Sequence, residues 1–253
     1  MGDSFTEGVG DELSSGELRG WADLVALGLA AAAIETTEAS GASGAAFSYA
    51  NLAIRGKLLR PIVDGQLEPA MHLAPDLLSI CGGGNDVMRP RVEIADIVAL
   101  LERVVERALA QGTHVMMLTG ANPTKQLPLG TLIERRGDRL ADAARQSFAQ
   151  RPGVTYVDNW LDLELTAARF WSADRLHLNA LGHARVAANA LTALNVSVLP
   201  EISAAAAPDA GSRVRTPAYY REHVLPWIGR RLSGRSSGDG RSAKRPELMP
   251  VEL

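Results

Sequence analysis

The fold of this chain is decided by residues 76–86, which read Asp-Leu-Leu-Ser-Ile-Cys-Gly-Gly-Gly-Asn-Asp. Residues 77–81 form a short apolar run that three glycines stop, a pattern typical of a strand buried on both faces of a parallel sheet. Cys81 is the only cysteine of the chain, so it forms no internal disulfide, and we interpret it as a small buried hydrophobic residue.

The same kind of pattern continues on both sides of this stretch. Short apolar runs predict further strands over 47–54, 114–118 and 154–157. Apolar residues at helical spacing predict helices over 18–33, 57–72, 92–111, 129–150 and 179–194. Strands that alternate with helices predict a parallel sheet covered on both faces, with its chemistry in the loops after the carboxyl ends of the strands.

The character of the sequence changes after about residue 204. We expect one domain over residues 1–200, followed by a linker and helical extension over 201–232. Residues 233–253 are rich in Gly, Ser and Arg, and we expect a disordered tail there.

Composition restricts the class of protein. The 253 residues carry a formal net charge of −3, which gives no basic field for nucleic acid. No apolar stretch reaches the length of a membrane span, and the first residues show no signal peptide, so we expect a cytoplasmic protein. The sequence leaves the oligomeric state open.

The first motif with chemical meaning is Gly2-Asp3-Ser4-Phe5-Thr6-Glu7-Gly8. A nucleophilic serine needs a tight, glycine-containing turn that exposes its hydroxyl group and aims its backbone N–H at the substrate. A bare Gly-Asp-Ser is often only a turn or a helix cap, whereas the longer string is more specific.

Two further motifs follow predicted strands. Gly83-Gly84-Asn85-Asp86 offers the side-chain amide of Asn85 to an oxyanion, although the motif alone is more typical of a plain strand-to-loop turn. Gly56 closes the run Asn51-Leu52-Ala53-Ile54-Arg55-Gly56 and is the least specific signal.

The fourth motif is Asp174-Arg175-Leu176-His177. This spacing lets the carboxylate accept from one ring nitrogen while the other nitrogen faces a serine. It stands directly before the last alanine-rich helix. His72, His114 and His223 show no metal-ligand spacing, and His183 is interpreted as a helix or supporting residue.

Together these four motifs resemble the conserved blocks of the SGNH (GDSL-type) hydrolase superfamily over about residues 1–195. The resemblance implies a three-layer α/β/α, flavodoxin-like fold with a mainly parallel sheet. It also implies Ser4, Asp174 and His177 as the catalytic triad, with an oxyanion hole formed by the backbone N–H groups of Ser4 and Gly56 and the amide of Asn85.

One departure from the family concerns the start of the chain. In the family a buried strand runs into Gly-Asp-Ser, in a sheet of order 2-1-3-4-5, whereas only Met1 precedes Gly2 here. We therefore expect the first central strand to be missing, with a gap or a non-family pairing between the first two remaining strands. We also expect Ser4 on a frayed terminus, and our hypothesis is that a longer form is the active protein.

The resemblance implies an esterase or lipase that cleaves small-molecule carboxylic esters through an acyl-enzyme, with no cofactor and no metal. Two alternatives stay open. One is an acyltransferase that uses the same triad, and the other is a non-catalytic module that binds acyl or carbohydrate groups. Specificity is expected in the loops at 8–18, 57–75 and 120–130.

Overall fold

A parallel sheet forms the centre of the molecule. The computed structural model describes residues 1–40, 47–127, 130–198, 216–226, 229 and 235–253. Strands β2 (Leu77–Ile80), β3 (His114–Leu118) and β4 (Val154–Val157) pair in parallel in the order β2-β3-β4. The three strands lie within the runs that the sequence predicted.

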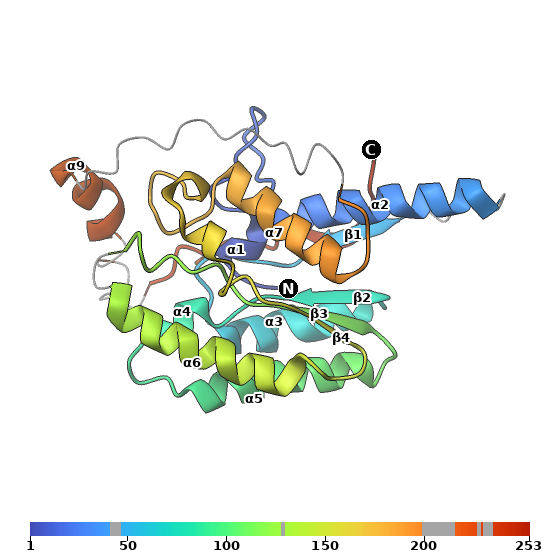
Figure 1. Cartoon of the computed structure of the whole chain (residues 1–253), viewed down its shortest axis with the longest axis horizontal. Helices are drawn as coiled ribbons and strands as arrows, with labels where there is room; N and C mark the ends of the chain where they lie inside the picture. Colours follow the sequence, from blue (N-terminus) through green and yellow to red (C-terminus); the bar gives the residue numbers. More distant parts are fainter. Residues whose placement is uncertain (41–46, 128–129, 199–215, 227–228, 230–234) are drawn as a thin grey trace.

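Helices cover both faces of this sheet (Figure 1). One face carries α2 (Trp21–Ser40) and α7 (Ala180–Ala193), and the other carries α3 (Leu59–His72), α5 (Ile94–Leu109) and α6 (Gly130–Phe148). Side chains alternate along β3, because Val115 and Met117 join the core beneath α3 and α5 while Met116 and Leu118 join the core beneath α2 and α7. The predicted three-layer fold is confirmed.

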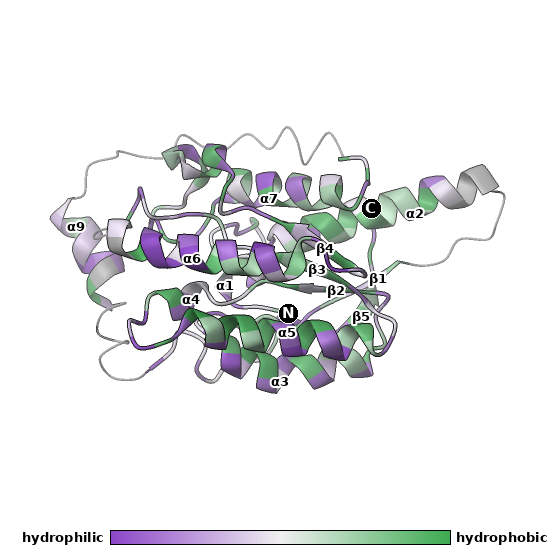
Figure 2. Ribbon diagram, turned by 60° about the horizontal axis from the view of Figure 1, so that its bottom comes forward, coloured by the Kyte–Doolittle hydropathy of each residue, from purple (hydrophilic) through white to green (hydrophobic). Residues whose placement is uncertain are grey.

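The covering helices bury the faces that their sequences predicted. Figure 2 shows apolar and polar segments alternating along α5. Its buried residues recur at helical spacing: Ile94, Ile97, Leu101, Val104, Val105 and Ala108. No helix within the described ranges is both long and apolar enough to cross a membrane.

The first two residues are held inside the molecule rather than frayed. Met1 is buried, and the Met1 amino group donates to the Ser79 carbonyl at 2.8 Å. Gly2 forms a parallel bridge with Cys81, while its backbone N–H and carbonyl bind the Gln66 side chain at 2.8 and 3.0 Å. The expectation that Ser4 sits on a frayed terminus is therefore wrong, because both edges of this short segment are hydrogen-bonded.

The expected gap between the first two strands is present. Strand β1 (Ser48–Asn51) does not pair with β2, and a cavity of about 380 Å³ lies between them, lined by side chains of α2, α3 and both strands. Beyond β1, the Ile54 N–H donates to the Gly2 carbonyl at 3.3 Å. The segment after β1 thus lies next to residues 1–2, which lie next to β2.

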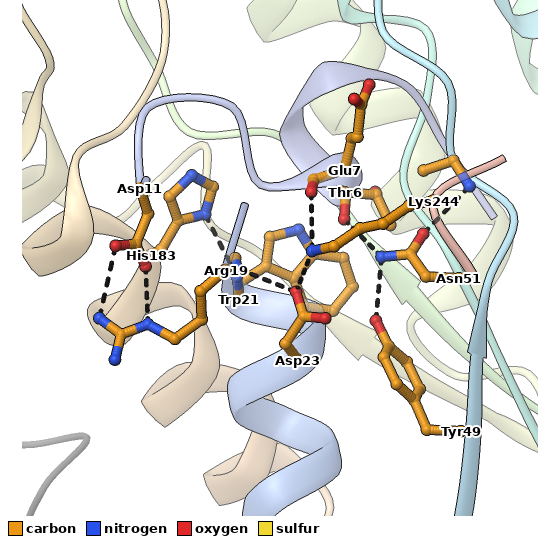
Figure 3. Close-up of polar contacts among 12 residues, drawn as sticks. Thr6, Glu7, Asp11, Arg19, Trp21, Asp23, Tyr49, Asn51, His183 and Lys244 are labelled. Carbon is orange, nitrogen blue, oxygen red and sulfur yellow. Dashed lines mark hydrogen bonds and ion pairs between the residues drawn. The ribbon is translucent and has the colours of Figure 1, made fainter. Parts of the chain in front are cut away.

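Strand β1 instead pairs with the end of the chain. Strand β5 (Arg245–Pro250) runs antiparallel to β1, with Ser48 opposite Pro250 and Tyr49 opposite Met249. Lys244, just before β5, donates its Nζ to the Glu7 carbonyl at 3.0 Å and to the Asp23 carboxylate at 2.7 Å (Figure 3). The expectation of a disordered tail over 233–253 is therefore wrong for residues 235–253. Their backbone pairs with β1, and the Lys244 side chain completes a polar cluster with Glu7 and Asp23.

The other short elements connect these layers. They are α1 (Ser4–Glu7), α4 (Gly84–Val87), the 3₁₀ turns Leu163–Thr166 and Ala168–Phe170, α9 (Pro217–Tyr219) and a π-helical turn, Tyr220–Val224. Most of the predicted linker falls on residues 199–215, outside the described residues. The predicted helical extension before residue 232 is described only in part, and the domain division at residues 200 and 232 stays a prediction.

Candidate active site

Ser4 is the first residue of α1, immediately after the segment bridged to β2. Asp3 caps this short helix by accepting from the Phe5 N–H at 3.1 Å, and Gly8 ends it with a left-handed φ of 94°. The turn is tight at Gly2, where a Cβ atom would lie 2.7 Å from the Cys81 carbonyl oxygen and closer still to Thr6. Glycine is therefore required for Ser4 to stand at the carboxyl edge of the sheet.

Polar contacts from several other elements hold α1 and the turn after it in place. The Asn51 amide donates to the Thr6 carbonyl at 2.9 Å, and the buried Glu7 carboxylate accepts from the Arg55 N–H at 2.6 Å and pairs with its guanidinium (Figure 3 labels the Thr6, Glu7 and Asn51 side chains). His183 accepts from the Trp21 N–H at 3.2 Å, and its other ring nitrogen lies 3.3 Å from the Val9 carbonyl. His183 thus supports the turn after α1, as expected, and burial lowers its pKa to about 4.

Asp174 and His177 lie on one tight loop. Trp171 and Leu178 form an antiparallel bridge at its base, and the Ser172 N–H donates to the His177 carbonyl at 2.9 Å. Arg175 turns the loop with a left-handed φ of 59°. The Asp174 carboxylate accepts from the backbone N–H of His177 at 3.0 Å and from the Ser172 hydroxyl at 2.7 Å.

The three predicted triad side chains form a continuous chain of contacts. His177 Nδ1 lies 2.6 Å from Asp174 Oδ2, and His177 Nε2 lies 3.0 Å from Ser4 Oγ. Burial raises the pKa of Asp174, but hydrogen bonds from His177 and Ser172 outweigh this effect and hold that pKa well below its usual range. A carboxylate that stays ionised orients the imidazole and stabilises its protonated form.

Asn85 lies in α4, on the loop after β2, and lines the same cavity as Ser4. Its amide nitrogen donates to Asp3 Oδ2 at 3.0 Å and to the Lys57 carbonyl at 2.9 Å. Both amide hydrogens are thus engaged. Burial raises the pKa of Asp3, the residue before Ser4, to about 6.

Gly56 lies on the loop after β1 and does not line that cavity among the described residues. Its φ is 72°, and its carbonyl accepts from the Ser236 hydroxyl at 3.0 Å. A Cβ atom at Gly56 would lie 2.5 Å from Ser236 Oγ, so the end of the chain packs directly on this glycine. The contact between Asn85 and Lys57 brings Gly56 to the edge of the site.

A cavity of about 140 Å³ opens beside Ser4 and His177. It runs over the carboxyl ends of β2 and β3 and continues beneath α6. The two tryptophans that flank the segment before Asp174, Trp160 and Trp171, both line it. Val9, Gly120, Ala121 and Pro123 come from the expected specificity loops, whereas none of the residues 57–75 contributes.

Sequence reasoning missed three features of this site. Ser172 supports Asp174, Gln66 holds Gly2, and the side chains of α6 form the far wall of the cavity. The serine stands two residues before Asp174, which is a usable local signal, but the other two contacts join distant parts of the chain. Among the described residues, no group of three His, Cys, Asp or Glu side chains is placed to hold a metal ion.

The chain matches the model of a known protein family. The model of the GDSL-like lipase/acylhydrolase family matches residues 1–185, which include every residue named for the candidate site except Ser236. A search of curated protein sequences found no match.

Several solved structures share the fold at low sequence identity. The lipase Lip_vut3 from a goat rumen metagenome is 16% identical with a TM-score of 0.55, covering 76% of this chain and 94% of that one. LAE5, an alpha/beta hydrolase from the metagenome of Lake Arreo, Spain, is 21% identical with a TM-score of 0.53, covering 77% and 92%. Axe2, an acetylxylan esterase from Geobacillus stearothermophilus, is 17% identical with a TM-score of 0.52, covering 78% and 93%.

Proposed function

Because this chain belongs to the GDSL-like lipase/acylhydrolase family and is in general terms an ester hydrolase, we propose that it cleaves carboxylic esters through an acyl-enzyme on Ser4. The observation that carries the proposal is the chain of contacts from Asp174 through His177 to Ser4, with distances of 2.6 and 3.0 Å. This is the arrangement in which imidazole removes a serine proton.

The proposed reaction begins with His177 Nε2, which takes the proton of Ser4 as the serine oxygen attacks the ester carbonyl carbon. The protonated His177 then gives that proton to the leaving alcohol as the carbon–oxygen bond breaks, which leaves an ester between Ser4 and the acyl group. Water enters, loses a proton to His177 and attacks the acyl carbon, and the proton returns to Ser4 as the acid departs.

The developing oxyanion is assigned to the backbone N–H groups of Ser4 and Gly56 and to the amide of Asn85. Since both hydrogens of that amide already bind Asp3 and Lys57, the oxyanion takes over one of these contacts as it forms. One such donor contributes on the order of 3 kcal/mol to the transition state. The substrate is a small-molecule ester.

The triad assignment is tested with p-nitrophenyl esters and an alkyl phosphonate ester. Wild type should release p-nitrophenol and gain the mass of one phosphonyl group on Ser4, and Ser4→Ala should do neither. Labelling at another residue with equal turnover by the variant would overturn the assignment.

The same contacts are compatible with transfer of the acyl group to an alcohol. Products from an ester and an added alcohol separate the two activities, since a transferase forms a new ester where a hydrolase forms the acid. A protein that binds esters without turning them over would instead be the non-catalytic module.

A further inference from the structure

The cavity beside Ser4 continues beneath α6, and we propose that this inner part holds the acyl chain of the substrate. Its lining residues on α6 begin at Ile133 and end at Ala144, eleven positions that span about 16 Å of helix. The cavity is therefore elongated from the edge of the sheet toward the core between α6 and β3. The inference rests on the proposed function and specifies its substrate class.

The walls of the inner part are apolar. Leu101 of α5, Met117 of β3 and Ala144 of α6 are each no more than 4% exposed and meet there. Leu140 and Ala141 add further apolar surface. Such walls favour a saturated hydrocarbon chain over a sugar or a charged group, because a buried polar group without a partner is costly.

The two polar side chains of this region are already bonded. The Tyr156 hydroxyl donates to the Ala141 carbonyl at 3.3 Å, and the Trp160 indole N–H donates to the Asp138 carboxylate at 2.8 Å. The Trp160 ring lies against Gly137, where a Cβ atom would come within 2.1 Å of it, so the ring closes the side of the cavity next to α6. The inner walls thus give shape rather than hydrogen bonds to a ligand.

The reaction itself decides which half of the ester lies inside. The alcohol must leave and water must reach His177 Nε2 while the acyl group stays bonded to Ser4. The His177 and Asp174 side chains are 20% and 29% exposed, whereas Ala144 is 3% exposed. The exposed side therefore serves the alcohol and the water, and the enclosed side serves the acyl chain.

The test is a series of p-nitrophenyl esters from acetate to decanoate. We expect kcat/KM to rise by about fourfold per added methylene until the cavity is filled, and then to fall. Ala144→Leu fills the inner end and should lower the ratio of kcat/KM for hexanoate over acetate by at least about tenfold. Leu140→Ala enlarges it and should move the optimum to longer chains. Ala149→Leu, the same change at an exposed position just past α6, should keep the wild-type ratio.

A second measurement is independent of turnover. Calorimetric titration of Ser4→Ala with octanoate should show binding, whereas titration with acetate should show none. Adding Ala144→Leu to the same background should weaken the binding of octanoate. Hydrolysis without dependence on acyl length, together with no octanoate binding, would overturn the inference and leave the proposed function standing. Dependence on the alcohol chain instead of the acyl chain would also overturn it. Octanoate binding without any hydrolysis would remove the proposed function alone.

Discussion

Lys244 Nζ lies 2.7 Å from the carboxylate of Asp23, 221 residues earlier in the chain, with both side chains less than 20% exposed. The same ammonium group binds the carbonyl of Glu7, the last residue of the helix that begins at Ser4. Lys244 lies outside the part of the chain that the family model matches. A segment outside the family match therefore braces the helix that carries the candidate nucleophile.

Deletion of residues 235–253 should lower both the melting temperature and the esterase activity. The deletion removes the strand that pairs with β1. It also removes Lys244, which binds the Glu7 carbonyl, and Ser236, which binds the Gly56 carbonyl. Lys244→Met alone should cost about 1–3 kcal/mol in the free energy of unfolding, because the mostly buried Asp23 carboxylate loses its cationic partner and keeps only the Gly20 N–H. Arg241→Met, a matched change at an exposed position, serves as the control. Equal melting temperatures for wild type and the truncated chain would show that the tail contributes nothing.

Ser4→Ala and His177→Ala should each lower kcat/KM by at least about a thousandfold, because Ser4 forms and breaks the bond to the acyl group and His177 transfers the proton. The double variant should be little worse than either single one, since the two residues act as a unit. His72→Ala, an exposed histidine, controls for loss of an imidazole. Independent, multiplying effects of the two changes would contradict the shared role.

Asp174→Asn should keep the loop but lower kcat by about 10⁴-fold, because an amide favours the wrong tautomer of His177. Ser172→Ala removes one of the contacts to the same carboxylate and should cost far less. Circular dichroism and thermal melting should show both variants folded. If Ser172→Ala costs as much as Asp174→Asn, then the geometry of the loop matters more than the charge of Asp174.

Asn85→Ala should lower kcat by about 10²–10³-fold with little change in KM, as expected for a contact that forms with the oxyanion. The variant also frees the Asp3 carboxylate and the Lys57 carbonyl, so the melting temperature must be measured alongside. A rise in KM at unchanged kcat would assign Asn85 to substrate binding instead.

The fold should lose stability through His183 as the pH falls from 6.5 to 4. The pKa of His183 is about 4 in the folded protein against 6.5 for an ordinary histidine, so the unfolded chain binds the proton more tightly. Stability from the neutral ring is complete above pH 6.5 and is lost as the pH falls through 4. Because burial raises the pKa of Asp3 to about 6, that group works in the opposite direction between pH 3.8 and 6.

The contribution of His183 is isolated by comparing wild type with His183→Gln in thermal melts. The variant should be less stable at pH 7.5, because it loses the paired contacts to Trp21 and Val9. The difference in melting temperature between the two proteins should shrink as the pH falls from 6.5 to 4, because wild type alone loses the contribution of the neutral His183 ring. Parallel curves for the two proteins would show that His183 does not titrate in this range.

Local sequence determined the layers of this protein. The runs at 77–80, 114–118 and 154–157 are short and mostly apolar, which favours burial in a covered parallel sheet. The tight Gly2 turn before Ser4 and the close spacing of Asp174 and His177 are also local features. These features place Ser4 after the segment bridged to β2, and Asp174 and His177 just before α7. Loops of this kind lie together at the carboxyl edge of a parallel sheet.

Only the tertiary structure decided which distant segments meet. The tail has few apolar residues, so its sequence predicts disorder, yet its backbone pairs with β1 because that edge is free of β2. Two contacts at the candidate site likewise join distant residues. The Asn85 amide donates to Asp3, and the Ser236 hydroxyl donates to the Gly56 carbonyl. Periodicity reports which face of an element is buried, but not what fills the space beside it. The cavity beneath α6 arises from side chains of six helices and strands and the loops between them, and its shape exists only once they pack.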